Sequence, residues 1–164
     1  MSVIAAKVTD SYISLASDSI MIKGEQKRIG EFRKLRCVQP GLICGGCGDV
    51  EELTLFFAFM NEHKPTSTTI KAVTDLLNDF RQYKFIYTNN DVINNCYLIA
   101  FNNYLYESDG MFVREVTTYT AIGEGEDFAL AALHLGHSAE EAVKVACDLC
   151  VSVAEPIVKF KMEF

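Results

Sequence analysis

Residues 118–153 read TYTAIGEGEDFALAALHLGHSAEEAVKVACDLCVSV, and this stretch decides the fold. It predicts a strand over 118–122, a glycine-flanked turn over 123–125, and two helices, from Asp127 to about Leu135 and from Ser138 to about Val153. A strand that leads into two successive helices disfavours a doubly wound parallel sheet, in which strands alternate with single helices.

An earlier pair of helices precedes this stretch. The first is predicted to start at Asp49, which with Glu52 forms an aspartate version of the capping box. Pro65 then interrupts the helical pattern, and a second helix begins near residues 67–69. Apolar residues recur at helical spacing in both, namely Val50, Leu53, Phe56, Phe57 and Met60 in the first and Ile70, Val73, Leu76, Leu77 and Phe80 in the second.

Short strands are predicted around the two helix pairs. They cover residues 2–8, 12–17, 42–44, 96–101, 104–106, 111–116, 118–122 and 157–164. The last strand alternates, with Val158, Phe160, Met162 and Phe164 on one face. The order of strands, helix pair, strands, helix pair and strand predicts an α+β fold in one domain over residues 1–164, with antiparallel sheets covered by helix pairs.

Composition narrows the class of protein. The 164 residues are 49% hydrophobic and 23% charged, which suits one globular domain with a substantial core. The net charge of −7 argues against a nucleic-acid binder. We expect no membrane span and no secretory signal, because the chain has neither a run of about 18 apolar residues nor a charged start followed by an apolar segment. A cytoplasmic location is expected.

Six cysteines raise the question of a metal. Two CxxC pairs occur, Cys44 with Cys47 and Cys147 with Cys150, but about 100 residues separate them, far more than in zinc ribbons. We therefore predict buried thiols in a reducing compartment. His134 and His137 are expected to be exposed residues at a helix end. No metal site is predicted.

Three residues near the N-terminus are evenly spaced. Asp18 lies 16 positions after Ser2, and Lys34 lies 16 positions after Asp18. If Met1 is removed, Ser2 carries both a hydroxyl and the free α-amine that could activate it, which is the arrangement of an N-terminal nucleophile hydrolase. The other basic residues of segment 23–36 are expected to face water in a hairpin.

Several stretches resemble the proteasome β-subunit family, and most closely its bacterial HslV-type branch. Residues 121–133 and 136–146 resemble its glycine turn and two alanine-rich helices, Ala-Ser-Asp-Ser at 16–19 its Ala-x-Asp-Ser, and Gly-Gly-Cys-Gly-Asp at 45–49 its glycine-rich turn. The similarity spans nearly the whole chain. It implies a four-layer αββα sandwich that assembles into homo-oligomeric rings.

The resemblance also implies a chemistry and a set of partners. It places the family's N-terminal nucleophile on Ser2, its aspartate on Asp18, its lysine on Lys34 and its oxyanion-binding glycine on Gly48, or nearer Gly45 if the preceding loop differs in length. The implied activity is HslV-like cleavage of unfolded proteins or peptides delivered by an AAA+ unfoldase ATPase. No cofactor is implied, and a monovalent cation near the loop after the last helix is left open.

Two departures from the family pattern keep alternatives open. Serine replaces the usual threonine at Ser2, and Glu124 replaces a serine that the family usually carries between two glycines. A carboxylate there favours the protonated amine and so weakens the base. One alternative is a catalytically inactive ring subunit or scaffold with Met1 retained. Another is a small-molecule amidase of the wider N-terminal nucleophile superfamily.

Overall fold

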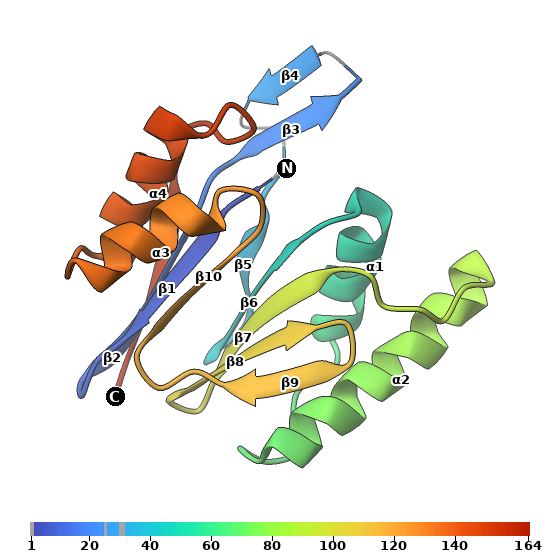
Figure 1. Cartoon of the computed structure of the whole chain (residues 1–164). Helices are drawn as coiled ribbons and strands as arrows, with labels where there is room; N and C mark the ends of the chain where they lie inside the picture. The colour runs from blue at the N-terminus through green and yellow to red at the C-terminus, as the bar shows by residue number, and fades with distance from the viewer. Residues whose placement is uncertain (1, 25, 30–31) are drawn as a thin grey trace.

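The structure, a computed structural model, describes residues 2–24, 26–29 and 32–164, and its elements stack in layers (Figure 1). In chain order the elements are β1 (Ile4–Val8), β2 (Tyr12–Ser17), β3 (Ile20–Lys23), β4 (Gln26–Ile29), β5 (Leu35–Gln39), β6 (Leu42–Cys47), α1 (Val50–Met60), α2 (Ile70–Thr88), β7 (Cys96–Phe101), β8 (Tyr104–Asp109), β9 (Phe112–Glu115), β10 (Tyr119–Ile122), α3 (Glu126–His134), α4 (Ala139–Leu149) and β11 (Val158–Glu163).

Two antiparallel sheets form the middle of the molecule. One has the strand order β10-β1-β2-β11 and the other β5-β6-β7-β8-β9, while β3 and β4 form a separate hairpin. In Figure 1, α3 and α4 (orange and red) cover the first sheet, and α1 and α2 (green) cover the second. The αββα sandwich with antiparallel sheets, expected from the sequence, is confirmed.

The alternation of side chains in β1 explains how the first sheet contributes to two apolar clusters, one under α3 and α4 and one between the two sheets. Ala5 packs with Ala129, Ala142 and other small residues of α3 and α4. Ile4 points to the opposite face and joins the cluster between the two sheets. Because neighbouring residues of a strand face opposite sides, the apolar run over residues 3–6 suits burial on both faces, while Lys7 and Val8 at the end of β1 are only partly buried.

The second sheet is built by the same rule. In β7, Tyr97 and Ile99 pack against α1 and α2, whereas Leu98 and Ala100 enter the cluster between the sheets. Aromatic side chains fill the space under α1, where the Phe56 and Tyr97 rings stack with centroids 3.9 Å apart. The core under α1 and α2 therefore consists mainly of large aromatic and aliphatic side chains, whereas alanines are frequent under α3 and α4.

Helix ends agree with the sequence in three places and depart from it in two. Thr69 caps α2, Gly136 follows α3 with a φ of 99°, and Ser138 and Glu141 form the expected capping box of α4. Helix α4 ends at Leu149, however, and not at about Val153, because Cys150 is extended. This early end lets Val153 turn into the core beside α3 and α4.

The second departure concerns α1. Asp49 caps the helix by accepting from the Glu52 N–H at 2.8 Å, but the Glu52 side chain does not return to Asp49 as a capping box requires. It turns inward instead, to Lys84 at 2.7 Å. A buried cation competes successfully with a backbone N–H for the carboxylate.

Several residues expected in the core are more exposed. Val50 and Ile70 begin their helices and are 40% and 44% exposed. In β11 only Met162 is buried, while Phe164 follows the strand and is 49% exposed. β11 lies at the edge of its sheet, so part of its apolar face has no covering layer. Among the described residues, no helix is long and apolar enough to cross a membrane.

Candidate active site

Asp18 lies directly after β2 and is fully buried. Its Oδ1 accepts from the Val3 N–H at 3.0 Å, and its Oδ2 accepts from the Ile20 N–H at 3.3 Å. The Asp18 N–H itself donates to the Val3 carbonyl at 3.2 Å. These bonds tie the carboxylate to the start of the chain, so Asp18 fixes the position of the residues around Ser2.

Lys34 lies directly before β5 and meets Asp18 from the second sheet. Its Nζ is 2.9 Å from Oδ1 and 2.7 Å from Oδ2 of Asp18, and the two side chains are 4% and 0% exposed. The Lys34 carbonyl accepts from the Gly46 N–H at 3.0 Å, which anchors it to β6. Because a buried charge is costly without a partner, each side chain of this ion pair stabilises and orients the other.

Ser2 is 4% exposed and is covered by the glycine turn after β10. Its carbonyl accepts from the Gly125 N–H at 3.2 Å. Gly123 has a φ of 101°, and a Cβ there would lie 2.4 Å from the Ser2 carbonyl oxygen. The turn can close over Ser2 in this way only because residue 123 has no side chain.

A pocket of about 70 Å³ brings three of the expected site residues together. Ser2, Lys34 and Gly48 all line it. The remaining walls are apolar and come from Ile20, Met21, Ile22, Phe32, Val50 and Leu53. Asp18 does not line the pocket but forms an ion pair with Lys34, so the four residues predicted from the sequence lie close together.

Gly48, and not Gly45, is the glycine at this pocket. Gly48 follows β6 with a φ of 134°, and a Cβ on it would lie 2.1 Å from Oδ1 of Asn95. Gly45 instead packs inside the sandwich, where a Cβ would lie 2.8 Å from Ile4 Cδ1 and 2.9 Å from Leu35 Cδ1. Gly45 thus allows close packing of the sheets and does not line the pocket.

Glu124 lies in the turn over Ser2. Its pKa is lowered, first by a hydrogen bond with Ser152 and also by the positive charge of Lys34. The carboxylate is therefore ionised at neutral pH and lies within the electrostatic reach of the lysine. Glu124 is not among the residues that line the pocket with Ser2.

Sequence reasoning missed Cys47, a buried thiol beside Ser2. Its Sγ donates to the Ile122 carbonyl at 3.6 Å. Burial raises the pKa of Cys47 to about 12, although Lys34 and a hydrogen bond with Ser2 act in the opposite direction. The thiol therefore stays neutral and is a poor nucleophile. Asn95, which packs on Gly48, was also missed, because no local motif marks it.

The remaining sequence predictions about cysteine, histidine and Met1 have mixed outcomes. Cys44 and Cys47 are buried, as expected, whereas Cys147 and Cys150 are only partly buried. His134 and His137 are exposed at the helix end, also as expected. Within the described part of the chain, no three side chains of histidine, cysteine, aspartate or glutamate are placed to hold a metal. Met1 lies outside the described residues.

No protein-family model and no curated protein matches this chain. Among solved structures, Thiobacillus denitrificans BPH in complex with epoxomicin is similar with a TM-score of 0.84 and 17% identity over 98% of both chains. Eukaryotic HslV from Trypanosoma brucei has a TM-score of 0.74 and 19% identity over 99% of both. Anbu, an ancestral beta-subunit from Yersinia bercovieri, has a TM-score of 0.74 and 16% identity over 98% of this chain and 81% of its own. The chain thus has the fold of the proteasome-type N-terminal nucleophile hydrolases.

Proposed function

We propose that this protein is a peptidase that uses Ser2 as an N-terminal nucleophile after removal of Met1. The observation that carries the proposal is the convergence of Ser2, Lys34 and Gly48 on one pocket, with Asp18 buried against Lys34. The chain also shares its fold with HslV, and this similarity of fold supports the proposed reaction class.

In the proposed reaction, the Ser2 hydroxyl oxygen attacks a peptide carbonyl carbon. Its proton passes to the α-amine of Ser2, directly or through a water molecule. The C–N bond of the substrate then breaks, the amine returns the proton to the leaving nitrogen, and an ester of Ser2 remains. Water attacks this ester with the same amine as base, releases the acid product and regenerates Ser2.

Lys34 and Gly48 have separate roles in this scheme. An α-amine has an ordinary pKa of about 7.7–8.0, and a cation such as Lys34 lowers it, which leaves more of the amine free to accept a proton at neutral pH. The Gly48 N–H would donate to the oxyanion, a contact worth about 3 kcal/mol in comparable sites. Asp18 holds the Lys34 ammonium group in place through their ion pair.

The pocket walls favour an apolar substrate residue beside the cleaved bond. Ile20, Met21 and Leu53 contribute apolar side chains there, and the volume of about 70 Å³ admits only a modest side chain. A charged residue in the same place would lose its hydration without gaining a partner on those walls. We therefore propose that peptides with a small or medium apolar residue are cleaved fastest.

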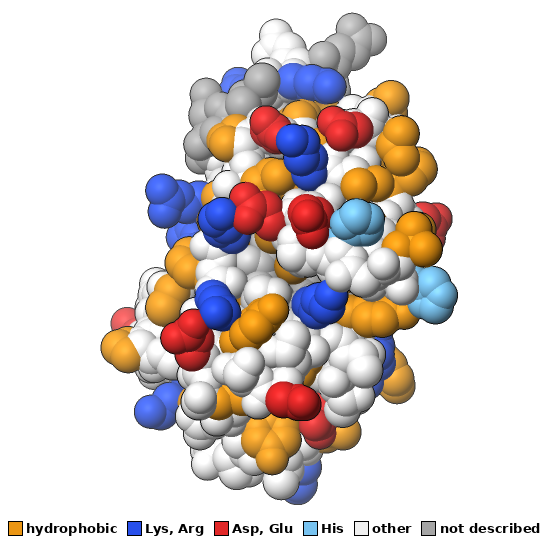
Figure 2. Space-filling view, turned by 90° about the vertical axis from the view of Figure 1, so that its left-hand side faces the viewer, with side chains coloured by type: hydrophobic (Ala, Val, Ile, Leu, Met, Phe, Trp, Pro, Cys, Tyr) orange, Lys and Arg blue, Asp and Glu red, His pale blue; other side chains and the backbone are white. Residues whose placement is uncertain are grey.

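The substrates and partners that we propose follow from the fold. Figure 2 views the side of the molecule formed by α3 and α4, where apolar side chains lie scattered among charged ones. Leu135 and Leu149 on these helices are 78% and 60% exposed, and Ile86 on α2 is 76% exposed. Apolar residues scattered singly are ordinary on a protein surface, so the proposed cytoplasmic homo-oligomeric ring, fed with unfolded chains by an AAA+ ATPase, rests on the similarity in fold to HslV. We propose no cofactor.

The test combines N-terminal mass analysis with a peptidase assay. Protein whose first residue is Ser2 should cleave fluorogenic peptides, and Ser2→Ala should abolish cleavage while retaining the fold. Cleavage that persists in Ser2→Ala would show that another residue is the nucleophile. A matched control is Ser67→Ala, at an exposed position before α2.

One observation favours a second candidate, a catalytically inactive subunit of the same fold. The ionised Glu124 lies near Lys34, where it offsets the positive charge that lowers the pKa of the amine. Retention of Met1 would also remove the base. Uniform retention of Met1 in protein from the native cell, together with absence of cleavage, would establish this candidate over the peptidase.

A further inference from the structure

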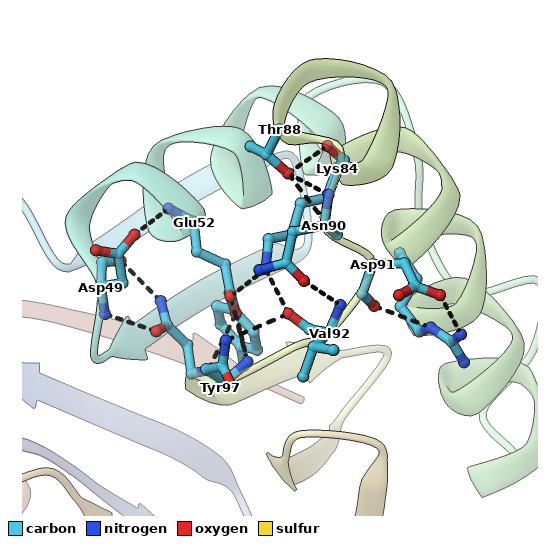
Figure 3. A network of polar contacts seen from close by, with 11 residues as sticks. Asp49, Glu52, Lys84, Thr88, Asn90, Asp91, Val92 and Tyr97 are labelled. Carbon is cyan, nitrogen blue, oxygen red and sulfur yellow. Dashed lines mark hydrogen bonds and ion pairs between the residues drawn. The ribbon is translucent and has the colours of Figure 1, made fainter.

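The turn that carries Gly48 is braced on its far side by a buried polar network between α1, α2 and the segment before β7 (Figure 3). We infer that Asn95, itself anchored by Glu52 and Lys84, is a positioning residue that holds the Gly48 N–H at the pocket wall. The catalytic consequence of this inference rests on the proposed function, whereas the placement of the turn does not.

The Asn95 side chain forms hydrogen bonds with both backbone groups of Asp49, the residue next to Gly48. Its Oδ1 accepts from the Asp49 N–H at 2.6 Å, and its Nδ2 donates to the Asp49 carbonyl at 2.9 Å. The side chain is buried, with 1% of the residue exposed. Among the hydrogen bonds of the described residues, the Asp49 N–H has an acceptor and the Gly48 N–H has none, so the Gly48 N–H is the one left for a ligand.

The contact between Asn95 and Gly48 is steric as well as polar. A Cβ on Gly48 would lie 2.1 Å from Oδ1 and 2.7 Å from Cγ of Asn95. The asparagine therefore fills the space that any other residue at position 48 would need. Gly48 thus packs against Asn95 and also lines the pocket with Ser2 and Lys34.

Glu52 fixes Asn95 in turn. Its carboxylate is buried and accepts from the Asn95 N–H at 3.0 Å and from the Tyr97 hydroxyl at 2.9 Å. Lys84 donates to Glu52 at 2.7 Å and also to the Val92 carbonyl. A buried carboxylate with this many donors has one favourable orientation. The network therefore fixes the position of the turn relative to Lys84 on α2 and Tyr97 on β7.

The network closes on itself at Asp49. The Asp49 side chain accepts from the Glu52 N–H at 2.8 Å, while the Glu52 side chain accepts from Asn95, and Asn95 holds the Asp49 backbone. An ordinary capping box would start α1 without Asn95 or Lys84. The extra residues add a fixed position for the turn, which matters because a displacement of about 1 Å in a catalytic group costs about 100-fold in rate.

The test separates positioning from folding by comparing kcat with KM. Asn95→Ala should lower kcat by about 10- to 100-fold with KM changed by less than about 3-fold, as expected when a transition-state contact is misplaced. Asn78→Ala, on the exposed side of α2, is the matched control and should leave both constants unchanged. If Asn95→Ala fails to fold, the double variant Glu52→Gln/Lys84→Met keeps the shapes of both side chains and should show the same split.

Amide hydrogen exchange gives a readout that needs no activity. In the wild type the Asp49 amide should be protected, and in Asn95→Ala it should exchange about 10-fold faster or more, with the Val3 amide unchanged. An unchanged kcat together with unchanged Asp49 exchange would overturn the inference. If the wild type cleaves no peptide, the proposed function fails, and the Asp49 exchange alone then decides whether Asn95 holds the turn.

Discussion

At the scale of single residues, the buried pair of Asp18 and Lys34 carries the most weight. Their proximity was predicted from the two intervals of 16 residues together with the resemblance to the proteasome β-subunit family. The sequence could not predict the place of Asn95, since it reaches Gly48 through a contact between segments far apart in sequence, and it did not distinguish Cys47, next to Gly48, from the other buried thiols. It also could not choose between Gly45 and Gly48, whose difference depends on which glycine packs against Ile4.

Replacing Lys34 tests the pair directly. Lys34→Met leaves Asp18 buried without its cation, so we expect a loss of about 3–5 kcal/mol in the free energy of unfolding, together with loss of peptidase activity. Urea denaturation measures the first effect. The control is Lys71→Met, which breaks the exposed pair of Lys71 with Asp75 and should cost less than about 0.5 kcal/mol. Equal effects of the two substitutions would contradict the role of burial.

Glu124 should set part of the pH dependence. Because its pKa is lowered, Glu124 stays ionised throughout the neutral range and favours the protonated α-amine. In Glu124→Gln the amine loses a negative neighbour, so its pKa falls and the acidic limb of kcat/KM moves to lower pH. A pH–rate profile of both proteins measures the shift. A limb that stays in place, or moves upward, would argue that Glu124 does not act on the base.

At the scale of elements, capping explains most helix boundaries, and tertiary contacts explain the exceptions. Ser138 and Glu141 form a local motif, so the start of α4 could be predicted from sequence. Glu52 occupies the same position in α1, but Lys84 lies 32 residues later and takes its carboxylate. The early end of α4 likewise depends on the core site that Val153 fills.

The cap of α4 gives a prediction at this scale. Ser138→Ala removes the side-chain acceptor for the Glu141 N–H, so unfolding should become easier by about 1 kcal/mol, with cleavage near the wild-type rate. Thermal unfolding measures the change, and Ser11→Ala in the exposed turn between β1 and β2 serves as the reference. A Ser138→Ala protein as stable as the reference would show that the motif adds nothing in this context.

At the scale of the whole molecule, three apolar clusters hold the four layers together. The cluster between the sheets contains residues of both β1 and β7. Along each of these strands, they alternate with residues that face the helices. The order of helices and strands predicted antiparallel sheets covered by helix pairs, whereas the four-layer arrangement was implied by the resemblance to the proteasome β-subunit family.

The middle cluster should dominate stability. Leu98 is fully buried between the sheets, and Leu98→Ala should lower the free energy of unfolding by about 2–5 kcal/mol. Leu135→Ala makes the same change at a position that is 78% exposed, and it should cost less than about 0.5 kcal/mol. Denaturant titrations of the two variants give the comparison. A small effect of Leu98→Ala would mean that the two sheets are held together elsewhere.

The central claim is that Ser2, with its own amine free, is the nucleophile. The most direct measurement is intact-mass and peptide-level mass spectrometry of protein quenched during peptide cleavage, when the proposed ester of Ser2 is present. The account predicts protein that lacks Met1 and carries one covalent adduct, mapped to Ser2 and absent from Ser2→Ala. Processed protein that cleaves peptides but is modified at another residue, or that remains unmodified at Ser2 and inactive, would contradict it.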